Sequence, residues 1–256
     1  MRTPIRHVLG AFAYAIWLLP TAALAQVTVL SEPGDPARHI FPSDRFTVDD
    51  PAQRTLRRVN LPKPDCTVRP ARCADIDVLN ELDGFNTQPR ISIPLSGAID
   101  PASVDGETLF VVGIGGIEGT GPVGRKVGIN QIVWDPETSV LHVEPDQLLD
   151  QHARYAVVVT NGIRGADGAP LAGSVEAGDV PRGALLQARR HTRHDIVALS
   201  VFTTLSTTAV LERIARRVRA GRPAPADFDI GNDGTVRTVF TLERVTRILA
   251  VRQTGT

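Results

Sequence analysis

Apolar positions between residues 90 and 205 fall into short runs that are separated by turn residues. Ile91, Ile93 and Leu95 alternate with serine and proline, which is the period of a strand that buries one face. The proline at position 94 favours the edge of a sheet. Runs rich in β-branched and aromatic residues predict further strands over residues 108–112, 131–134, 140–143, 155–160 and 196–203. This spacing predicts an Ig-like antiparallel β-sandwich rather than a parallel α/β sheet, so the fold class is mainly β.

The remaining segments have different patterns. Residues 183–192 and 208–219 show helical periodicity, and in the second stretch apolar residues line one face while arginines lie away from it. Threonine at 207 or 208 can cap its start, and Gly221 with Pro223 ends it. Residues 113–128 hold seven glycines without periodicity and predict a mobile loop. We also predict a strand over 236–240 and an amphipathic segment over 242–251.

Residues 26–89 are rich in proline, aspartate and arginine, and at this density of proline we expect no long helix and no central strand. The predicted organisation is therefore a signal peptide over 1–25, an extended lead-in over 26–89, an Ig-like sandwich over 90–205, and a helix and strand connector over 206–256.

The first residues have the layout of a secretory signal peptide. Positive residues open the chain, an apolar stretch covers residues 8–19, and small residues lead to a predicted cleavage between Ala25 and Gln26. An N-terminal membrane anchor is the alternative, but the stretch is shorter than the roughly 20 residues that a spanning helix needs. We expect a secreted, periplasmic or envelope protein with no membrane span after cleavage.

Charge and cysteine content limit the classes of partner and ligand that we expect this chain to bind. The chain has 28 basic and 28 acidic residues, so no overall charge attracts it to nucleic acid. The charge is uneven, with an excess of arginine from residue 182 onward, which favours attraction between the two parts of the chain over a basic docking surface. Cys66 and Cys73 are the two cysteines, and in an oxidising compartment we expect a disulfide that closes a short loop. Two thiols make a poor zinc site.

Several motifs resemble known bacterial families. Residues 96–104, 155–171 and 201–204 resemble bacterial Ig-like domains of the SbsA type, although Val201 stands where a tryptophan is expected and Arg164-Gly165 departs from the usual turn. Together with residues 41–44, 79–89 (LNELDGFNTQP), 205–212 and 237–242, they are similar to the N-terminal region of virulence-factor lipases. The resemblance implies a sandwich ahead of an α/β-hydrolase catalytic domain, and we expect this chain to lack that domain.

The candidate catalytic and ligand-binding residues do not match the motifs that catalysis or metal binding requires. An esterase of that class needs a serine in a G-x-S-x-G turn, and Ser96, Ser103 and Ser174 all lack the flanking glycines. The triad histidines to consider are His142, His152, His191 and His194. His191, His194 and Asp195 form the densest cluster of possible metal ligands, but neighbouring arginines oppose a cation.

Two loops suggest ligands only weakly. Residues 229–234 resemble a calcium loop, but they lack a ligand at the third position and a glutamate at the twelfth. The glycines at 113, 115, 116 and 119 follow a strand without a following helix, which disfavours a phosphate loop. We expect no cofactor, metal or catalytic residue.

The predicted function is a non-catalytic exported module that docks on a lipase or esterase domain or on a cell-envelope protein. Two alternatives stay open: a truncated product of a lipase gene whose parent hydrolyses esters, and a stand-alone cell-surface adhesion protein.

Overall fold

The computed structural model describes residues 26–32, 34–117, 121–175 and 181–221. The chain divides into two units, Met1–Ser206 and Thr207–Thr256, and each is described by itself. The predicted signal peptide, the possible calcium loop at 229–234, the strand at 236–240 and the segment at 242–251 lie outside the described residues.

The first unit is built mainly from strands. Its strands are β1 (Thr47–Asp49), β2 (Arg57–Val59), β3 (Ile91–Pro94), β4 (Leu109–Gly116), β5 (Lys126–Val127), β6 (Ile129–Asp135), β7 (Val140–Pro145), β8 (Ala153–Thr160) and β9 (Ile196–Thr203). Its helices are α1 (Pro70–Leu79) and α2 (Arg182–Arg189), with short 3-10 turns at Pro36–Arg38, Asp44–Phe46 and Pro101–Ser103. The described part of the second unit holds one helix, α3 (Ala209–Ala220).

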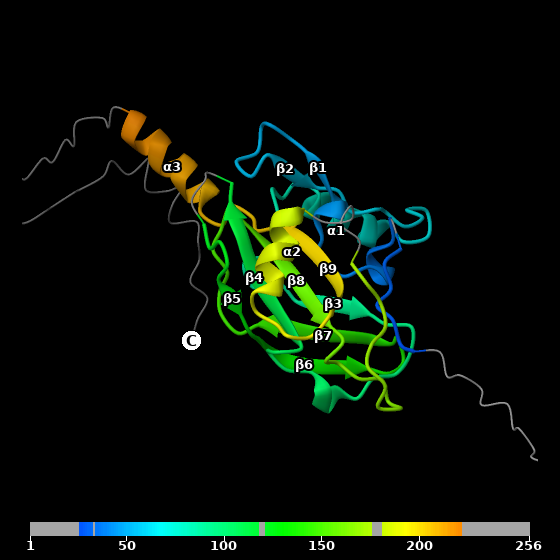
Figure 1. Ribbon diagram of the computed structural model, residues 1–256. Coiled ribbons are helices and arrows are strands. Elements are labelled where there is room, and N and C mark those ends of the chain that lie inside the picture. The colour runs from blue at the N-terminus through cyan, green and yellow to red at the C-terminus, as the bar shows by residue number, and fades with distance from the viewer. Residues whose placement is uncertain (1–25, 33, 118–120, 176–180, 222–256) are drawn as a thin grey trace, which may run out of the picture. The chain divides into compact units, whose positions relative to one another are not determined.

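Two antiparallel sheets form the Ig-like sandwich that the sequence predicts (Figure 1). One sheet has the order β3-β7-β6, and the other has the order β5-β4-β8-β9. The predicted hairpin of β6 and β7 is present, with Asp135 opposite Val140. Strand β3 lies at the edge of its sheet, as Pro94 predicts, and Phe41 pairs with Ser92 across that edge.

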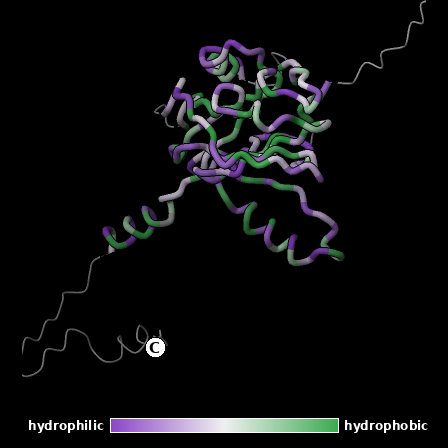
Figure 2. Tube along the Cα trace, turned by 90° about the horizontal axis from the view of Figure 1, so that it is seen from below, coloured by the Kyte–Doolittle hydropathy of each residue, from purple (hydrophilic) through white to green (hydrophobic). Residues whose placement is uncertain are grey.

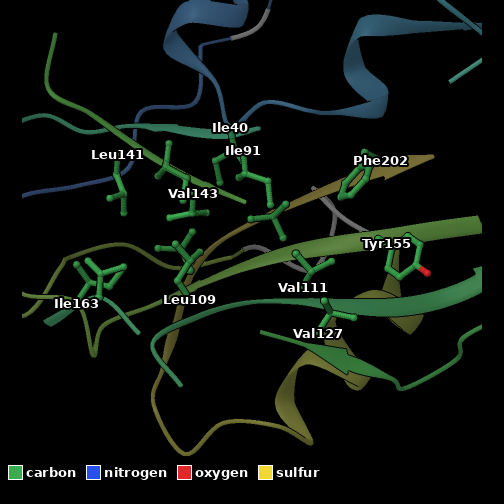
Figure 3. Close-up of a cluster of buried hydrophobic side chains, with 14 of the residues drawn as sticks. Ile40, Ile91, Leu109, Val111, Val127, Leu141, Val143, Tyr155, Ile163 and Phe202 are labelled. Carbon is green, nitrogen blue, oxygen red and sulfur yellow. The ribbon is translucent and has the colours of Figure 1, made fainter. Parts of the chain in front are cut away.

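The main core lies between the two sheets, as the close-up in Figure 3 shows. Ile91, Leu141 and Val143 of the smaller sheet face Leu109 and Val111 of the larger one. All five side chains are fully buried, and each such aliphatic group contributes about 1.5–3 kcal/mol on leaving water. The alternation of inward and outward side chains in β3 and β7 therefore follows from a single buried face.

Strands β4 and β8 are buried on both faces. Phe110, Val112, Ala156 and Val158 point away from the main core and form a second cluster beneath α2. Helix α2 contributes Ala184 and Ala188, small residues whose Cβ atoms let the helix lie close to the sheet (Figure 1). Figure 2 shows hydrophobic positions concentrated along the central strands of this unit. Burial on both sides explains why residues 155–160 lack polar alternation.

The lead-in is more structured than its proline content predicts. Residues 70–79 form the ten-residue helix α1, and β1 pairs with β2. Pro70 stands in the first turn of α1, where a backbone N–H has no partner within the helix, so proline is compatible with this position. The expectation of an extended, loop-rich lead-in was therefore wrong over residues 70–79.

The predicted disulfide closes this region. Cys66 and Cys73 are bonded, with their Cα atoms 5.7 Å apart, and the bond ties the N-terminal half of α1 to the preceding loop. Lead-in residues also enter the main core: Ile40, Phe46, Val59 and Phe85 are all buried. The lead-in thus packs as part of the same unit as the sandwich.

The glycine-rich stretch is also more regular than a mobile loop. Strand β4 continues to Gly116, and Lys126–Val127 forms β5 beside it. Gly113 allows this arrangement, because a Cβ there would meet the Pro122 carbonyl oxygen at 1.8 Å. Glycine at this position therefore serves a close approach of two backbone segments, and the prediction of a loop over 113–128 was wrong at both ends.

Helix α3 begins after Thr208 and ends at Gly221, as the sequence predicts. Thr208 makes no capping bond to the backbone, and its hydroxyl donates to Glu212 at 2.7 Å. Leu211, Ile214 and Val218 are all exposed and share one face of the helix at the spacing of successive turns.

Candidate functional site

Two of the three serines considered from the sequence have hydrogen-bond partners, and the third, Ser174, lines the cavity described below. Ser96 Oγ accepts the Thr28 backbone N–H at 2.9 Å. Ser103 Oγ donates to the Asp100 carbonyl at 2.6 Å and accepts the Arg164 N–H at 2.9 Å. Neither hydroxyl has a hydrogen bond to a histidine, so neither has an adjacent general base.

Ser92 is different, because it bonds a histidine. Ser92 on β3 and His142 on β7 are cross-strand partners, and Ser92 Oγ lies 2.9 Å from His142 Nδ1. Burial, with a smaller contribution from the nearby Arg90 charge, lowers the pKa of His142 below 6.5, so the ring is neutral at pH 7. This pair was not found from the sequence, because only the register of β3 on β7 brings position 92 opposite position 142.

This pair lacks the third group of a catalytic triad in the described part of the chain. A triad needs a carboxylate bonded to the other imidazole nitrogen. Asp135 acts on His142 only at a distance, since its oxygens accept from the Glu137 N–H at 3.0 Å and the Thr138 hydroxyl at 2.7 Å. Within the part of the chain that the structure describes, no hydrogen bond reaches His142 Nε2. Ser92 also stands in the middle of a strand rather than on a strand-to-helix turn.

The remaining candidate histidines and Asp195 have different surroundings and different hydrogen-bond partners. His191 Nε2 bonds the Gly124 carbonyl oxygen at 2.7 Å, which joins the end of α2 to the loop before β5. Asp195 bonds Asn161 through both its backbone N–H and its carboxylate. His152 is buried in the turn before β8. Among the described residues, no three His, Cys, Asp or Glu side chains are placed to share a metal ion.

A cavity of about 670 Å³ lies along β9, the outer strand of the larger sheet. This volume is within the range of small-molecule pockets. Residues 197–201 of β9 form one wall, residues 172–175 with Pro181 form another, and residues 39–40 and 43–45 of the lead-in form a third. Arg57 and Arg154 line it as well, and neither Ser92 nor His142 does.

Asp44 is the acidic group of this cavity, and its side chain is only 11% exposed. Its Oδ2 accepts the Thr203 hydroxyl at 2.9 Å, and it lies 3.7 Å from Arg57 Nε and 3.9 Å from Arg154 Nε. The last two distances are ion pairs but too long for hydrogen bonds. Burial raises the pKa of Asp44, while Arg57, Thr203 and Arg154 offset part of the effect.

Polar atoms at this site are buried without a hydrogen-bond partner in the described residues. They are Asp44 Oδ1, Arg154 Nε and His39 Nε2. His39 bonds the Ile40 carbonyl through Nδ1 at 2.9 Å, so Nδ1 carries the proton and Nε2 is a free acceptor. Burial lowers the pKa of His39 and keeps the ring neutral. Buried polar groups are nearly always paired in folded proteins, so three orphaned atoms around one cavity mark a place where a ligand can supply the partners.

Sequence reasoning did not find this site. Its residues are scattered from position 29 to position 201, and each alone is an ordinary Asp, Arg or His. The one available signal was the segment 41–44, which resembles lipase N-terminal regions and ends at Asp44.

The described residues contain no helix long and apolar enough to cross a membrane. No curated protein matches the chain. A family model does match: residues 70–178, which begin at α1, are similar to the bacterial Ig-like domain family. Domains of this family are generally non-catalytic and typically extracellular or on the cell surface. Residues 70–178 therefore resemble this family, and the antiparallel sheets of the structure are consistent with an Ig-like β-sandwich.

Proposed function

We propose that this protein is an exported, non-catalytic Ig-like module that docks on the catalytic domain of a secreted lipase or esterase. Export rests on the predicted signal peptide over residues 1–25. The non-catalytic role is supported by the family match and by the Ser92–His142 pair, which lacks a bonded carboxylate and a strained turn. The esterase partner comes from the resemblance of residues 41–44, 79–89 and 205–212 to lipase N-terminal regions.

The observation that carries the docking role is the apolar stripe of α3. Leu211, Ile214 and Val218 are 67%, 53% and 69% exposed. Arg213, Arg216 and Arg217 accompany them on other faces, and Arg216 pairs with Glu212 at 3.9 Å. An amphipathic helix of this kind binds by laying its apolar side in a groove of a partner. Solvent exposure of three branched aliphatic side chains on one stripe is costly unless a partner covers them.

Capture from the producing bacterium tests this proposal. Immobilised mature chain, from Gln26, is incubated with envelope and culture-medium fractions, and the eluate is assayed with p-nitrophenyl butyrate. We expect the wild type to enrich ester hydrolysis. A variant carrying Leu211→Asp and Ile214→Asp loses the enrichment, whereas the matched control with Arg213→Gln and Arg217→Gln keeps it. Lack of enrichment by the wild type, or equal enrichment by all three, contradicts docking through α3.

A further inference from the structure

The bonds of neighbouring residues show which backbone N–H and C=O groups of β9 point to its outer edge. Thr204 N donates to the Ala153 carbonyl, so the backbone N–H and C=O groups of residue 204 point toward β8. Phe85 N donates to the Thr203 carbonyl, so the backbone N–H and C=O groups of residue 203 point away from β8. Since backbone groups alternate along a strand, Leu199 and Val201 also point their N–H and C=O groups outward, and Ala198, Ser200 and Phe202 point theirs toward β8.

Both ends of this edge are occupied. Phe85 pairs beside Thr204, and its carbonyl accepts the Leu205 N–H at 2.7 Å. At the other end Gly173 lies against Val197, where an added Cβ would meet the Val197 carbonyl oxygen at 2.9 Å. The open stretch of β9 between them is the wall of the cavity, and in the described part of the chain no backbone group bonds Leu199 or Val201 on that side.

The charge of the cavity favours an acidic partner. Arg45, Arg57 and Arg154 line it, and Asp44 is its one acidic lining residue. Arg57 also pairs with the exposed Asp49 at 3.8 Å, so of the two arginines that pair with Asp44, Arg154 has the fewer carboxylate partners. Its Nε is buried and has no hydrogen bond among the described residues. Bonds between guanidinium and carboxylate groups are about twice as strong as neutral hydrogen bonds.

We infer that the cavity binds a short extended segment of a partner protein, which adds to the edge of β9 and places an acidic side chain at Arg154 and Arg57. Backbone groups of the segment bond the outward N–H and C=O of Leu199 and Val201. Its carboxylate bonds Arg154 Nε, and donors of the segment meet Asp44 Oδ1 and His39 Nε2. This is strand addition, in which backbone bonds supply affinity and pockets supply specificity. The site lies in the first unit and does not involve α3.

The probes are acetylated and amidated pentapeptides of alternating valine and threonine, with one aspartate at the second, third or fourth position. Binding to the mature chain is measured by calorimetry. We expect at least one peptide to bind in the sub-millimolar range. Its asparagine counterpart binds at least tenfold more weakly, because a guanidinium bonds a carboxylate more strongly than it bonds a neutral amide oxygen. Peptides methylated at backbone nitrogens lose binding, and acetyl-aspartyl amide alone does not replace the pentapeptide.

Protein variants test each half of the site. Leu199→Pro removes one outward N–H without removing a bond to β8, and Leu199→Ala is its matched control. Arg154→Met keeps the aliphatic stem and removes the guanidinium, and Arg38→Met, which lies outside the cavity, is its control. We expect Leu199→Pro and Arg154→Met each to weaken binding at least tenfold relative to their controls.

Hydrogen exchange gives an independent readout that needs no variant. In the free protein the amides of Leu199 and Val201 exchange faster than those of Ala198, Ser200 and Phe202, and the bound peptide slows the first two selectively. The inference is overturned if no aspartate peptide binds at about 1 mM, well within the weak range of affinities. It is also overturned if the asparagine peptide binds equally, or if binding leaves the exchange of Leu199 and Val201 unchanged. Capture of an esterase through α3 is unaffected by Leu199→Pro, so the two proposals fail separately.

Discussion

The hydroxyl of Thr203 donates a hydrogen bond to Asp44 Oδ2 at 2.9 Å, across 159 positions of sequence. This bond joins the 3-10 turn of the lead-in to the last residue of β9 and holds a carboxylate at the side of the cavity. The same carboxylate is largely buried and has only long ion pairs to Arg57 and Arg154. The site is therefore stabilised by few direct bonds, which leaves its charged groups available to a ligand.

Replacement of Asp44 by asparagine should change how stability depends on pH. Burial raises the pKa of Asp44 above 3.8 in the folded state, so its stabilising contribution is complete below 3.8 and is lost as the pH rises through the folded pKa. Asp44→Asn lacks this titration. We expect the free energy of unfolding of the wild type, relative to Asp44→Asn, to fall as the pH rises from 3.8 through the folded pKa. Urea titrations at several pH values measure it, and a difference that rises with pH would count against the assignment.

The lead-in should be essential to the stability of the sandwich. Phe85 is buried, and its ring packs against Phe41 in a T-shaped arrangement with centroids 5.4 Å apart. Phe85→Ala should lower the free energy of unfolding by about 3–5 kcal/mol. The nearby Leu82→Ala, at an exposed position, should stay within about 0.5 kcal/mol of the wild type. Equal, small effects in denaturant titrations would mean that the lead-in does not share the core.

The hydroxyl of Tyr155 should matter apart from its ring. Its ring is fully buried and stacks on Phe202, while its oxygen accepts the Asp150 N–H at 2.9 Å and Arg125 Nη2 at 3.2 Å. Tyr155→Phe leaves the Asp150 N–H without its acceptor, and we expect a loss of about 1 kcal/mol in denaturant titrations. Arg125→Met removes only a half-exposed contact and serves as control, with an expected change below about 0.5 kcal/mol. A neutral Tyr155→Phe would show that this bond contributes nothing.

Reduction of the disulfide should loosen α1 and spare the sandwich. Closure of so short a loop contributes about 2–3 kcal/mol in chain-entropy estimates. Within α1 the buried residues are Cys73 and Ile76, so little packing remains when the bond is lost. We expect limited proteolysis of the reduced protein to begin within residues 66–79 while the rest of the first unit stays intact. Two titratable thiols in the untreated protein would contradict the bond itself.

Sequence patterns predicted the strands well where they bury a face. Residues 91–95 and 140–143 lie in half-buried strands whose side chains alternate, and 155–160 lie in a strand that is buried on both sides and continuously apolar. Residues 131–134 also form a strand, although Ile132 and Val133 are exposed. Residues 70–79 were missed because α1 buries only two side chains and follows a run of prolines. Strand β5 was missed because two residues carry no period.

The candidate site could not be predicted for a different reason. Its polar atoms come together only through the crossing of the lead-in beside β9, and a pairing such as Asp44 with Thr203 leaves no local pattern. The outward direction of Leu199 and Val201 likewise depends on the register of β8 and β9, which follows from packing rather than from neighbouring residues.

Ester hydrolysis by the purified chain from Gln26 distinguishes a non-catalytic module from an enzyme. We expect turnover of p-nitrophenyl butyrate to equal the buffer rate across pH 6–9, where a neutral imidazole is able to act as a base, and we expect Ser92→Ala and His142→Ala to change nothing. Turnover above buffer that is lost in either variant would make Ser92 a nucleophile and this sandwich an enzyme.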